Sequence, residues 1–217
     1  MKVLIIGATG SIGRVVSAEL LKNTDAELVL AARHISPTMI SDTSRETAIN
    51  LDVTNDQGLV TALDGLDVTN DQGLVTALDC IDFVFAALSG RMNTFAKHLV
   101  KVMDQVGVKR LAFITTMGIY QEIPSWLGES PNPYHNLILR PYRKAADTIE
   151  NSDLDYTIIR PGWLDNGPAD YELTKKGEPF GGHDVSRYAI ADLVIKMVKN
   201  PEFGNRESFG INRPQAH

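Results

Sequence analysis

Residues 2–13 read KVLIIGATGSIG, and the chain is best understood from this stretch outward. Its first part, Val3 to Ile6, is a short apolar run rich in β-branched residues, which is typical of a strand buried on both faces. Glycines follow at a three-residue spacing, and residues 14–23 have the pattern of an amphipathic helix. The stretch therefore predicts a strand, a tight glycine turn and a helix, in that order.

Such a turn has a specific use in dinucleotide binding. Glycine permits a tight backbone and the close approach of a pyrophosphate, and the following helix offers unpaired N–H groups and a partial positive charge. Three glycines in a loop can also be just a loop, but here the strand before them and the helix after them favour the cofactor site. The predicted contacts in this turn are Gly7, Thr9, Gly10, Ser11, Ile12 and Gly13.

The end of the next predicted strand, residues 26–33, indicates which dinucleotide is bound. In sites that prefer NAD, an acidic residue about twenty positions after the glycines takes the ribose hydroxyls. Here that position falls near Arg33, with His34 beside it. A guanidinium favours a 2′-phosphate by its charge and its bidentate geometry, so NADP(H) is predicted in preference to NAD(H). The alternative is a solvated arginine at a strand end.

The rest of the chain alternates between strand and helix patterns. This alternation predicts an α/β fold in three layers, with a mostly parallel sheet covered on both faces, and a single domain over 1–217. Pro141 lies near a predicted helix start, where proline is tolerated, and Asp184 is a predicted helix cap. Further strands are predicted at 47–53, 81–88, 110–120, 155–164 and 207–212, and further helices at 92–108, 140–152 and 184–200.

Bulk composition excludes several classes of protein. The 217 residues carry a net charge of −6, which gives no basic surface for nucleic acid or anionic membrane. A single cysteine excludes an intrachain disulfide and a cysteine metal cluster, and it fits a cytoplasmic location. No apolar run approaches the length of a membrane span. A soluble monomer or homodimer that acts on a small molecule is expected.

Residues 51–65 and 66–80 are the same fifteen residues, apart from Gly65 and Cys80. Two short copies do not make a repeat fold, because such folds need several longer units to bury a continuous core. A recent tandem duplication, natural or introduced by cloning, is simpler. The first copy alone follows a strand, so we assign Asp52 and Val53 to the sheet and to the adenine of the cofactor. Each copy carries the same helix pattern, but only one helix can form the crossover between the strands predicted at 47–53 and 81–88. This predicts poor order or a helical protrusion within 56–72.

These features together resemble the atypical, NAD(P)H-binding branch of the short-chain dehydrogenase/reductase superfamily, the NmrA-like or extended-type relatives. The resemblance spans nearly the whole chain, and its most specific parts are the glycine motif and LDYTIIRPGWL. The stretches that carry it are GATGSIG at 7–13, LAAR at 30–33, LDV at 51–53, FAALSG at 85–90, FITTMGIY at 113–120 and LDYTIIRPGWL at 154–164.

The resemblance implies a seven-stranded Rossmann sheet in the order 3-2-1-4-5-6-7, with the dinucleotide across the C-terminal strand ends. It also implies that residues after the sixth strand border the nicotinamide. On this basis the further cofactor-binding residues are Ala86, Ala87, Leu88, Thr115, Pro161, Gly162 and Trp163.

The catalytic residues of that superfamily are a Ser or Thr and a Tyr-x-x-x-Lys motif. Thr116 aligns with the Ser or Thr, although a structural role beside the cofactor is an alternative. No Tyr-x-x-x-Lys precedes LDYTIIRPGWL, where the superfamily has it; the one such spacing in the chain, Tyr171 and Lys175, follows that stretch. Tyr142 and Lys144 are the nearest substitutes, but two residues apart on a helix they point to different faces unless Pro141 distorts the first turn. Tyr134 and His135 are alternative proton donors, whereas His98 and His183 are expected at the surface.

Two functional classes remain open at this point. One is a reductase that passes hydride from NADPH to a small carbonyl, quinone or similar compound, for which the cofactor supplies the difficult chemistry. The other is an NADP(H)-binding redox sensor without turnover. Epimerase or dehydratase chemistry on a nucleotide sugar would need the missing base and a larger substrate region. The expected substrate region, about 163–183, is short, and Trp126, Trp163 and Tyr171 would make the pocket aromatic. For Trp126 and Tyr171 a core position is the favoured alternative, whereas the place of Trp163 beside Pro161 and Gly162 favours the cleft.

Overall fold

The computed structural model describes residues 1–54, 81–128 and 133–214. The predicted protrusion within 56–72, and the roles assigned to the second copy of the repeat, lie outside the described residues. No helix in the described ranges combines the length and the hydropathy of a membrane-crossing segment.

The strands form a main sheet in the order β3-β2-β1-β4-β5-β6-β10-β8. Neighbouring strands from β3 to β10 are parallel, and the edge strand β8 pairs antiparallel with β10. The order 3-2-1-4-5-6-7 and the α/β class are therefore confirmed, and β8 is an eighth strand that was not predicted. The strands are β1 (Lys2–Ile6), β2 (Glu27–Ala32), β3 (Glu46–Asn50), β4 (Phe83–Ala86), β5 (Arg110–Ile114), β6 (Asp155–Pro161), β8 (Glu172–Thr174) and β10 (Glu207–Asn212).

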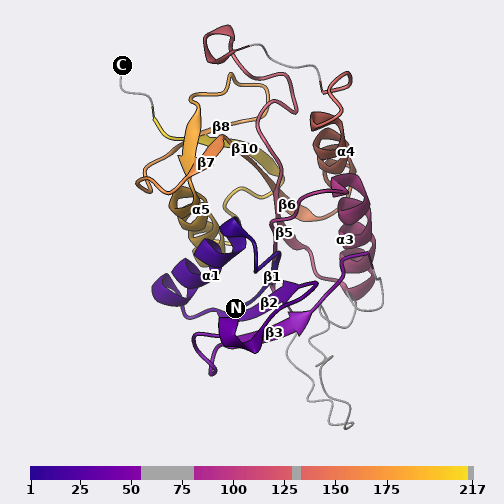
Figure 1. Cartoon of the computed structure of the whole chain (residues 1–217). Coiled ribbons are helices and arrows are strands. Elements are labelled where there is room, and N and C mark those ends of the chain that lie inside the picture. Colours follow the sequence, from indigo (N-terminus) through magenta and orange to yellow (C-terminus); the bar gives the residue numbers. More distant parts are fainter. Residues whose placement is uncertain (55–80, 129–132, 215–217) are drawn as a thin grey trace.

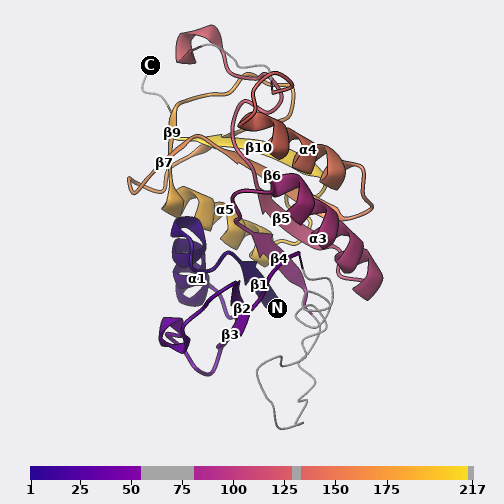
Figure 2. The same ribbon diagram turned by 45° about the vertical axis from the view of Figure 1, so that its right-hand side comes forward.

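Two pairs of helices cover the sheet in the described part of the chain (Figures 1 and 2). Helices α1 (Ser11–Asn23) and α5 (Arg187–Lys199) pack side by side on one face, and α3 (Met92–Val106) and α4 (Leu139–Glu150) pack on the other. Each face has its own apolar core, because the central strands are buried on both sides. Short 3-10 turns form at η1 (Pro37–Met39) and η2 (Ser125–Leu127).

Several predicted boundaries were wrong. The strands predicted at 110–120 and 155–164 end at Ile114 and Pro161, and the strand predicted at 81–88 spans only Phe83–Ala86. The third strand ends at Asn50 rather than 53, so Asp52 and Val53 lie in the turn after the sheet and not in it. The Asp52 carboxylate accepts hydrogen bonds from the N–H (2.9 Å) and the hydroxyl (2.8 Å) of Thr54. These bonds form an Asx turn just after the strand.

Asp184 does not cap the last helix. It opens β9 (Asp184–Ser186), which pairs in parallel with β7 (Trp163–Asp165) to form a separate two-stranded sheet. The cap of α5 is Ser186, whose hydroxyl accepts a hydrogen bond from the N–H of Ala189 at 2.9 Å.

Replacing Ser186 with alanine should lower the free energy of unfolding by about 1 kcal/mol, because the buried cap leaves a helix N–H unsatisfied. Asp184→Ala is the matched variant, since its exposed carboxylate bonds to His183 and not to the helix. Urea unfolding should therefore show a smaller loss for Asp184→Ala than for Ser186→Ala. The reverse order would mean that Asp184 caps the helix after all.

Candidate functional site

Two adjoining cavities lie where the parallel strands end. The smaller has a volume of about 400 Å³ and opens over β1, β2 and β4, and the larger, of about 720 Å³, opens over β5 and β6. They share Gly10, Ala87, Leu88 and Ser89, so they form one continuous groove across the sheet edge. An open α/β sheet binds ligands at this edge.

The glycine turn is built for close backbone approach. Gly7 has φ +89°, and a Cβ there would lie 2.2 Å from the Ala87 carbonyl oxygen. A Cβ on Gly13 would lie 2.3 Å from the Gly7 carbonyl oxygen, so this residue lets α1 pack against the turn. Gly10 caps α1 without a side-chain hydrogen bond, and the first turn carries no acidic residue. The helix therefore presents free N–H groups to the groove, as a pyrophosphate requires.

The smaller cavity holds a carboxylate between two guanidinium groups. Arg33, Asp52 and Arg91 all line it. Hydrogen bonds from Thr54 hold the pKa of Asp52 below its usual value, and the charges of Arg33 and Arg91 lower it further. Both arginines are exposed, and their side chains form no hydrogen bond or ion pair within the described part of the chain, which leaves them available to a ligand. His34, next to Arg33, does not line the cavity.

The larger cavity begins at the ends of β5 and β6. Thr115 and Thr116 lie on its wall, and the Thr115 hydroxyl is already used, because it donates to the Ile159 carbonyl oxygen at 3.1 Å. Gly162 lies on the floor, where a Cβ would meet the His183 carbonyl oxygen at 2.3 Å. Trp163 follows at the mouth with 62% of its surface exposed.

The predicted cofactor contacts are largely brought together. Those that line one cavity or both are Gly7, Thr9, Gly10, Ser11, Ile12, Arg33, Asp52, Val53, Ala87, Leu88, Thr115, Pro161, Gly162 and Trp163. Gly13 and Ala86 lie behind this surface, Gly13 against the turn and Ala86 in the core at the end of β4.

The predicted catalytic residues separate into two groups. Thr116 and Tyr142 line the larger cavity. Lys144 is exposed on α4 and does not line it, as the two-residue spacing predicts for a regular helix, so Pro141 does not bring the pair together. Tyr142 forms no hydrogen bond through its side chain with another described residue, which leaves its hydroxyl free. The alternatives Tyr134 and His135 are exposed and also lie outside the lining.

Of the three aromatic residues expected around the substrate, only Trp163 lines the larger cavity. Trp163 lines the cavity and stacks on the His183 ring, with centroids 6.0 Å apart. Trp126 is exposed and adjoins the cavity through its neighbour Leu127. Tyr171 takes the alternative position in the core: it packs against the α5 face, where its hydroxyl donates to Asp192 at 2.9 Å.

A buried ion pair supports the loop that forms one wall of the larger cavity. Arg160 on β6 and Glu122 are 2.5 Å apart, with side chains 0% and 2% exposed. The Glu122 carboxylate also accepts hydrogen bonds from the N–H groups of Gly118 (3.0 Å) and Tyr120 (2.8 Å). Since Gly118 and the preceding Met117 line the cavity, the pair fixes the shape of this wall.

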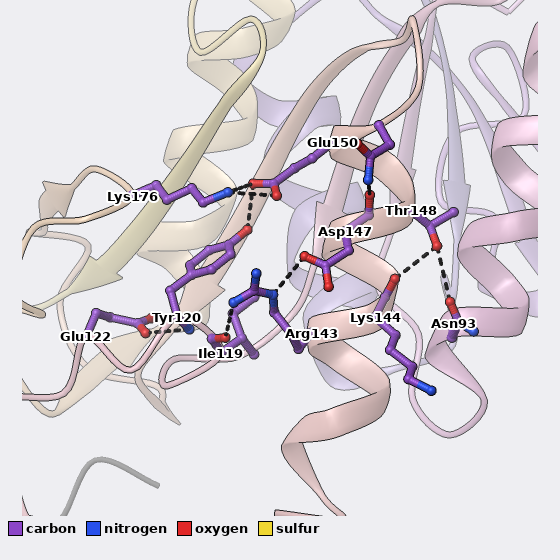
Figure 3. Close-up of polar contacts among 11 residues, drawn as sticks. Asn93, Ile119, Tyr120, Glu122, Arg143, Lys144, Asp147, Thr148, Glu150 and Lys176 are labelled. Carbon is purple, nitrogen blue, oxygen red and sulfur yellow. Dashed lines mark hydrogen bonds and ion pairs between the residues drawn. The ribbon is translucent and has the colours of Figure 1, made fainter. Parts of the chain in front are cut away.

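Beside this pair, Tyr120 is surrounded by charged groups, as Figure 3 shows. Its hydroxyl donates to Glu150 at 2.8 Å, and Lys176 binds the same carboxylate. Burial raises the pKa of Tyr120 well above its ordinary value, so the phenol stays neutral. Arg143 lies over the ring at 4.9 Å. The cluster ties α4 to the segment after β8 and lies outside the cavity lining.

Several lining residues were missed in the sequence. Arg91 directly precedes α3. It could have been predicted, because it is a cation that comes just after the turn at Ser89 and Gly90. Asn136 could have been found as a turn residue before α4, because its side-chain oxygen accepts from the N–H of Ile138 at 2.9 Å. The others are apolar loop residues without a local signal, namely Met117, Ile123, Leu127, Ile138, Leu139 and Leu164.

Comparison with known proteins gives consistent results. A family described as NAD(P)H-binding matches residues 7–68 and 66–201, two ranges that meet at the start of the second copy of the repeat. A sugar epimerase from Bacillus subtilis (strain 168), YhfK, itself described as uncharacterized, is 26% identical, with 94% of this chain and 92% of the relative covered.

Two solved structures are similar over the whole chain. A Rossmann-fold NAD(P)-binding family protein from Shigella flexneri is 35% identical with a TM-score of 0.77, covering 99% of this chain and 94% of that one. A wide-type short-chain dehydrogenase/reductase from Veillonella parvula, in complex with NADP, is 26% identical with a TM-score of 0.82, covering 100% and 96%. With its glycine turn, its strand order and these matches, the chain belongs to the NAD(P)H-binding family and has the Rossmann fold of the short-chain dehydrogenase/reductase superfamily.

Proposed function

We propose that this protein is an NADPH-dependent reductase of a small carbonyl compound, quinone or similar acceptor. The observation that carries the proposal is the continuous groove: a phosphate-binding turn and two arginines line one end, and a cavity with a free tyrosine hydroxyl lies at the other. A bound NADPH would supply hydride to the acceptor from its nicotinamide ring.

Each end of the groove has its own role in binding. The free N–H groups at the start of α1 would hold the pyrophosphate. Arg33 and Arg91 outnumber Asp52, so the adenosine end carries a net positive charge, which favours a 2′-phosphate over a hydroxyl. Gly162 and Trp163 would border the nicotinamide, as in the family that the chain resembles.

The proton for the reaction would come from Tyr142. When hydride reaches the carbonyl carbon, the C=O double bond opens and its oxygen takes the Tyr142 proton, which gives an alcohol; water then returns the proton to the tyrosine. The Thr116 hydroxyl would orient the same oxygen. Lys144 has no part in this scheme, because its side chain lies outside the cavity lining.

The test is NADPH oxidation with a panel of aldehydes, ketones and quinones, followed by the loss of NADPH absorbance. Turnover of at least one class supports the reductase. Tight NADPH binding with no turnover across the panel would contradict it and favour a redox sensor.

Tyr142→Phe should lower kcat for a carbonyl acceptor by about 10- to 100-fold and leave the Kd for NADPH unchanged. A loss near tenfold is expected if a water molecule replaces the phenol as the proton donor. Lys144→Met is the matched variant on the same helix, and it should leave kcat unchanged. A larger loss for Lys144→Met than for Tyr142→Phe would restore the lysine to the mechanism.

A further inference from the structure

The larger cavity carries no formal charge on its described lining. Its polar groups are hydroxyls and one amide, and no Asp, Glu, Lys, Arg or His of the described residues lines it. From this we infer that the molecule it binds is uncharged and largely apolar, and that phosphorylated or nucleotide-linked sugars are excluded. The inference rests on the proposed function, in which this cavity holds the hydride acceptor.

The apolar surface comes from two sides of the mouth. Leu127 and Ile138 approach from the segment between β5 and α4, and Trp163 and Leu164 from β7. Ile138 is 75% exposed although it lines the cavity. Apolar side chains clustered and exposed around a cavity indicate a ligand that covers them, because removing apolar surface from water is favourable.

The free polar groups of the described lining are neutral, so none of them can pair with the charge of a phosphate. The Thr115 hydroxyl donates to Ile159, and the Asn136 side-chain oxygen accepts from the N–H groups of Ile138 and Leu139. The lining hydroxyls without a partner among the described residues are those of Ser11, Ser89, Thr116 and Tyr142, and the Asn136 amide N–H groups are also unused. Ser11 and Ser89 lie next to the glycine turn and the shared end of the groove, which leaves Thr116, Tyr142 and the Asn136 amide for the acceptor. Two hydroxyls can satisfy one carbonyl oxygen, whereas an unpaired buried phosphate or several unpaired hydroxyls would be costly.

Two arginines near the cavity wall, Arg143 and Arg160, are held by carboxylates outside the lining. Arg143 is held by Asp147 at 2.7 Å and by the Ile119 carbonyl oxygen at 3.3 Å, and its guanidinium turns away toward Tyr120 (Figure 3). Arg160 is buried against Glu122. A diphosphate entering the cavity would therefore gain no charge pairing from either arginine, and no arginine of the described residues is part of the lining.

The test measures binding to the NADP⁺-saturated protein by calorimetry, so it does not depend on turnover. The probes are 2-naphthol, its charged counterpart 6-hydroxynaphthalene-2-sulfonate, and UDP-glucose. We expect 2-naphthol to bind at least about tenfold more tightly than either charged probe. Equal or tighter binding of the sulfonate or of UDP-glucose, or no binding of 2-naphthol, would overturn the inference.

Ile138→Arg places a cation in the lining and should reverse the preference between 2-naphthol and the sulfonate. Leu137→Arg is the matched control, because Leu137 is 80% exposed and does not line the cavity, so the preference should stay as in the parent chain. An unchanged preference in Ile138→Arg would place the probe elsewhere and overturn the inference. If 2-naphthol binds as expected while no carbonyl is reduced, the proposed function fails and the ligand class stands.

Discussion

Replacing both Arg33 and Arg91 with alanine should weaken NADPH binding by about 10²- to 10⁴-fold while leaving NADH binding within about threefold. A hydrogen bond to a charged group contributes about 1.5–3 kcal/mol, and each 1.4 kcal/mol is about tenfold in Kd. The two arginines face the same cavity from different elements, one after β2 and one before α3, so a 2′-phosphate between them would contact both.

Asp52 makes the effect of the double variant sharper. Its pKa is held low by Thr54 and by the two arginines, so its carboxylate is ionised. Without those arginines it would still be anionic at neutral pH, and it would repel a 2′-phosphate but accept hydrogen bonds from the ribose hydroxyls of NADH. Each single variant should therefore reduce the preference for NADPH, and the double variant should abolish or invert it.

The measurement is calorimetric Kd for both cofactors, with Lys97→Ala as the control. Lys97 is an exposed cation on α3, the helix that Arg91 precedes, and it lines neither cavity. Its removal tests whether a change in net charge alone alters binding. Equal losses for NADPH and NADH in the arginine variants would remove the 2′-phosphate argument and leave the arginines as general anion contacts.

What the sequence could predict was local. The glycine turn, the arginine after β2 and the apolar strands follow from spacing within a few residues, and this is why the fold class and most of the cofactor groove were predicted. Tyr142, which lines the larger cavity, was reached by counting back from LDYTIIRPG to the position of the superfamily's lysine. The same reasoning indicated that Lys144 would point elsewhere, since two residues of a helix differ by about 200° in direction.

What the sequence could not predict depends on tertiary packing. Leu127, Ile138 and Asn136 lie in a loop-rich segment without periodicity, and they reach the cavity because α4 and the Glu122–Arg160 pair hold that segment over the sheet. The helix cap was placed two residues early because Asp184 and Ser186 are both good caps, and the pairing of β9 with β7 decides between them.

The Glu122–Arg160 pair carries the largest expected effect on stability. Arg160→Met should lower the free energy of unfolding by about 3–5 kcal/mol, because it leaves the Glu122 carboxylate buried without its counter-charge. The guanidinium also donates to the carbonyl oxygens of Ser208 (3.2 Å) and Thr174 (3.3 Å), which would lose a donor in β10 and β8. Urea unfolding followed by circular dichroism measures the loss.

The double variant Arg160→Met/Glu122→Gln separates the charge from the packing. In that variant the side chain at position 122 carries no charge to desolvate. Its single amide oxygen can replace one of the two carboxylate oxygens that accept from the N–H groups of Gly118 and Tyr120, so one of these bonds is lost. The variant should therefore recover part, but not all, of the stability lost by Arg160→Met. Lys109→Met, which removes an exposed ion pair with Asp153, should change stability far less. If Arg160→Met were as mild as Lys109→Met, the pair would not be the support of the Met117–Gly118 wall, and the cavity would keep its shape by apolar packing alone.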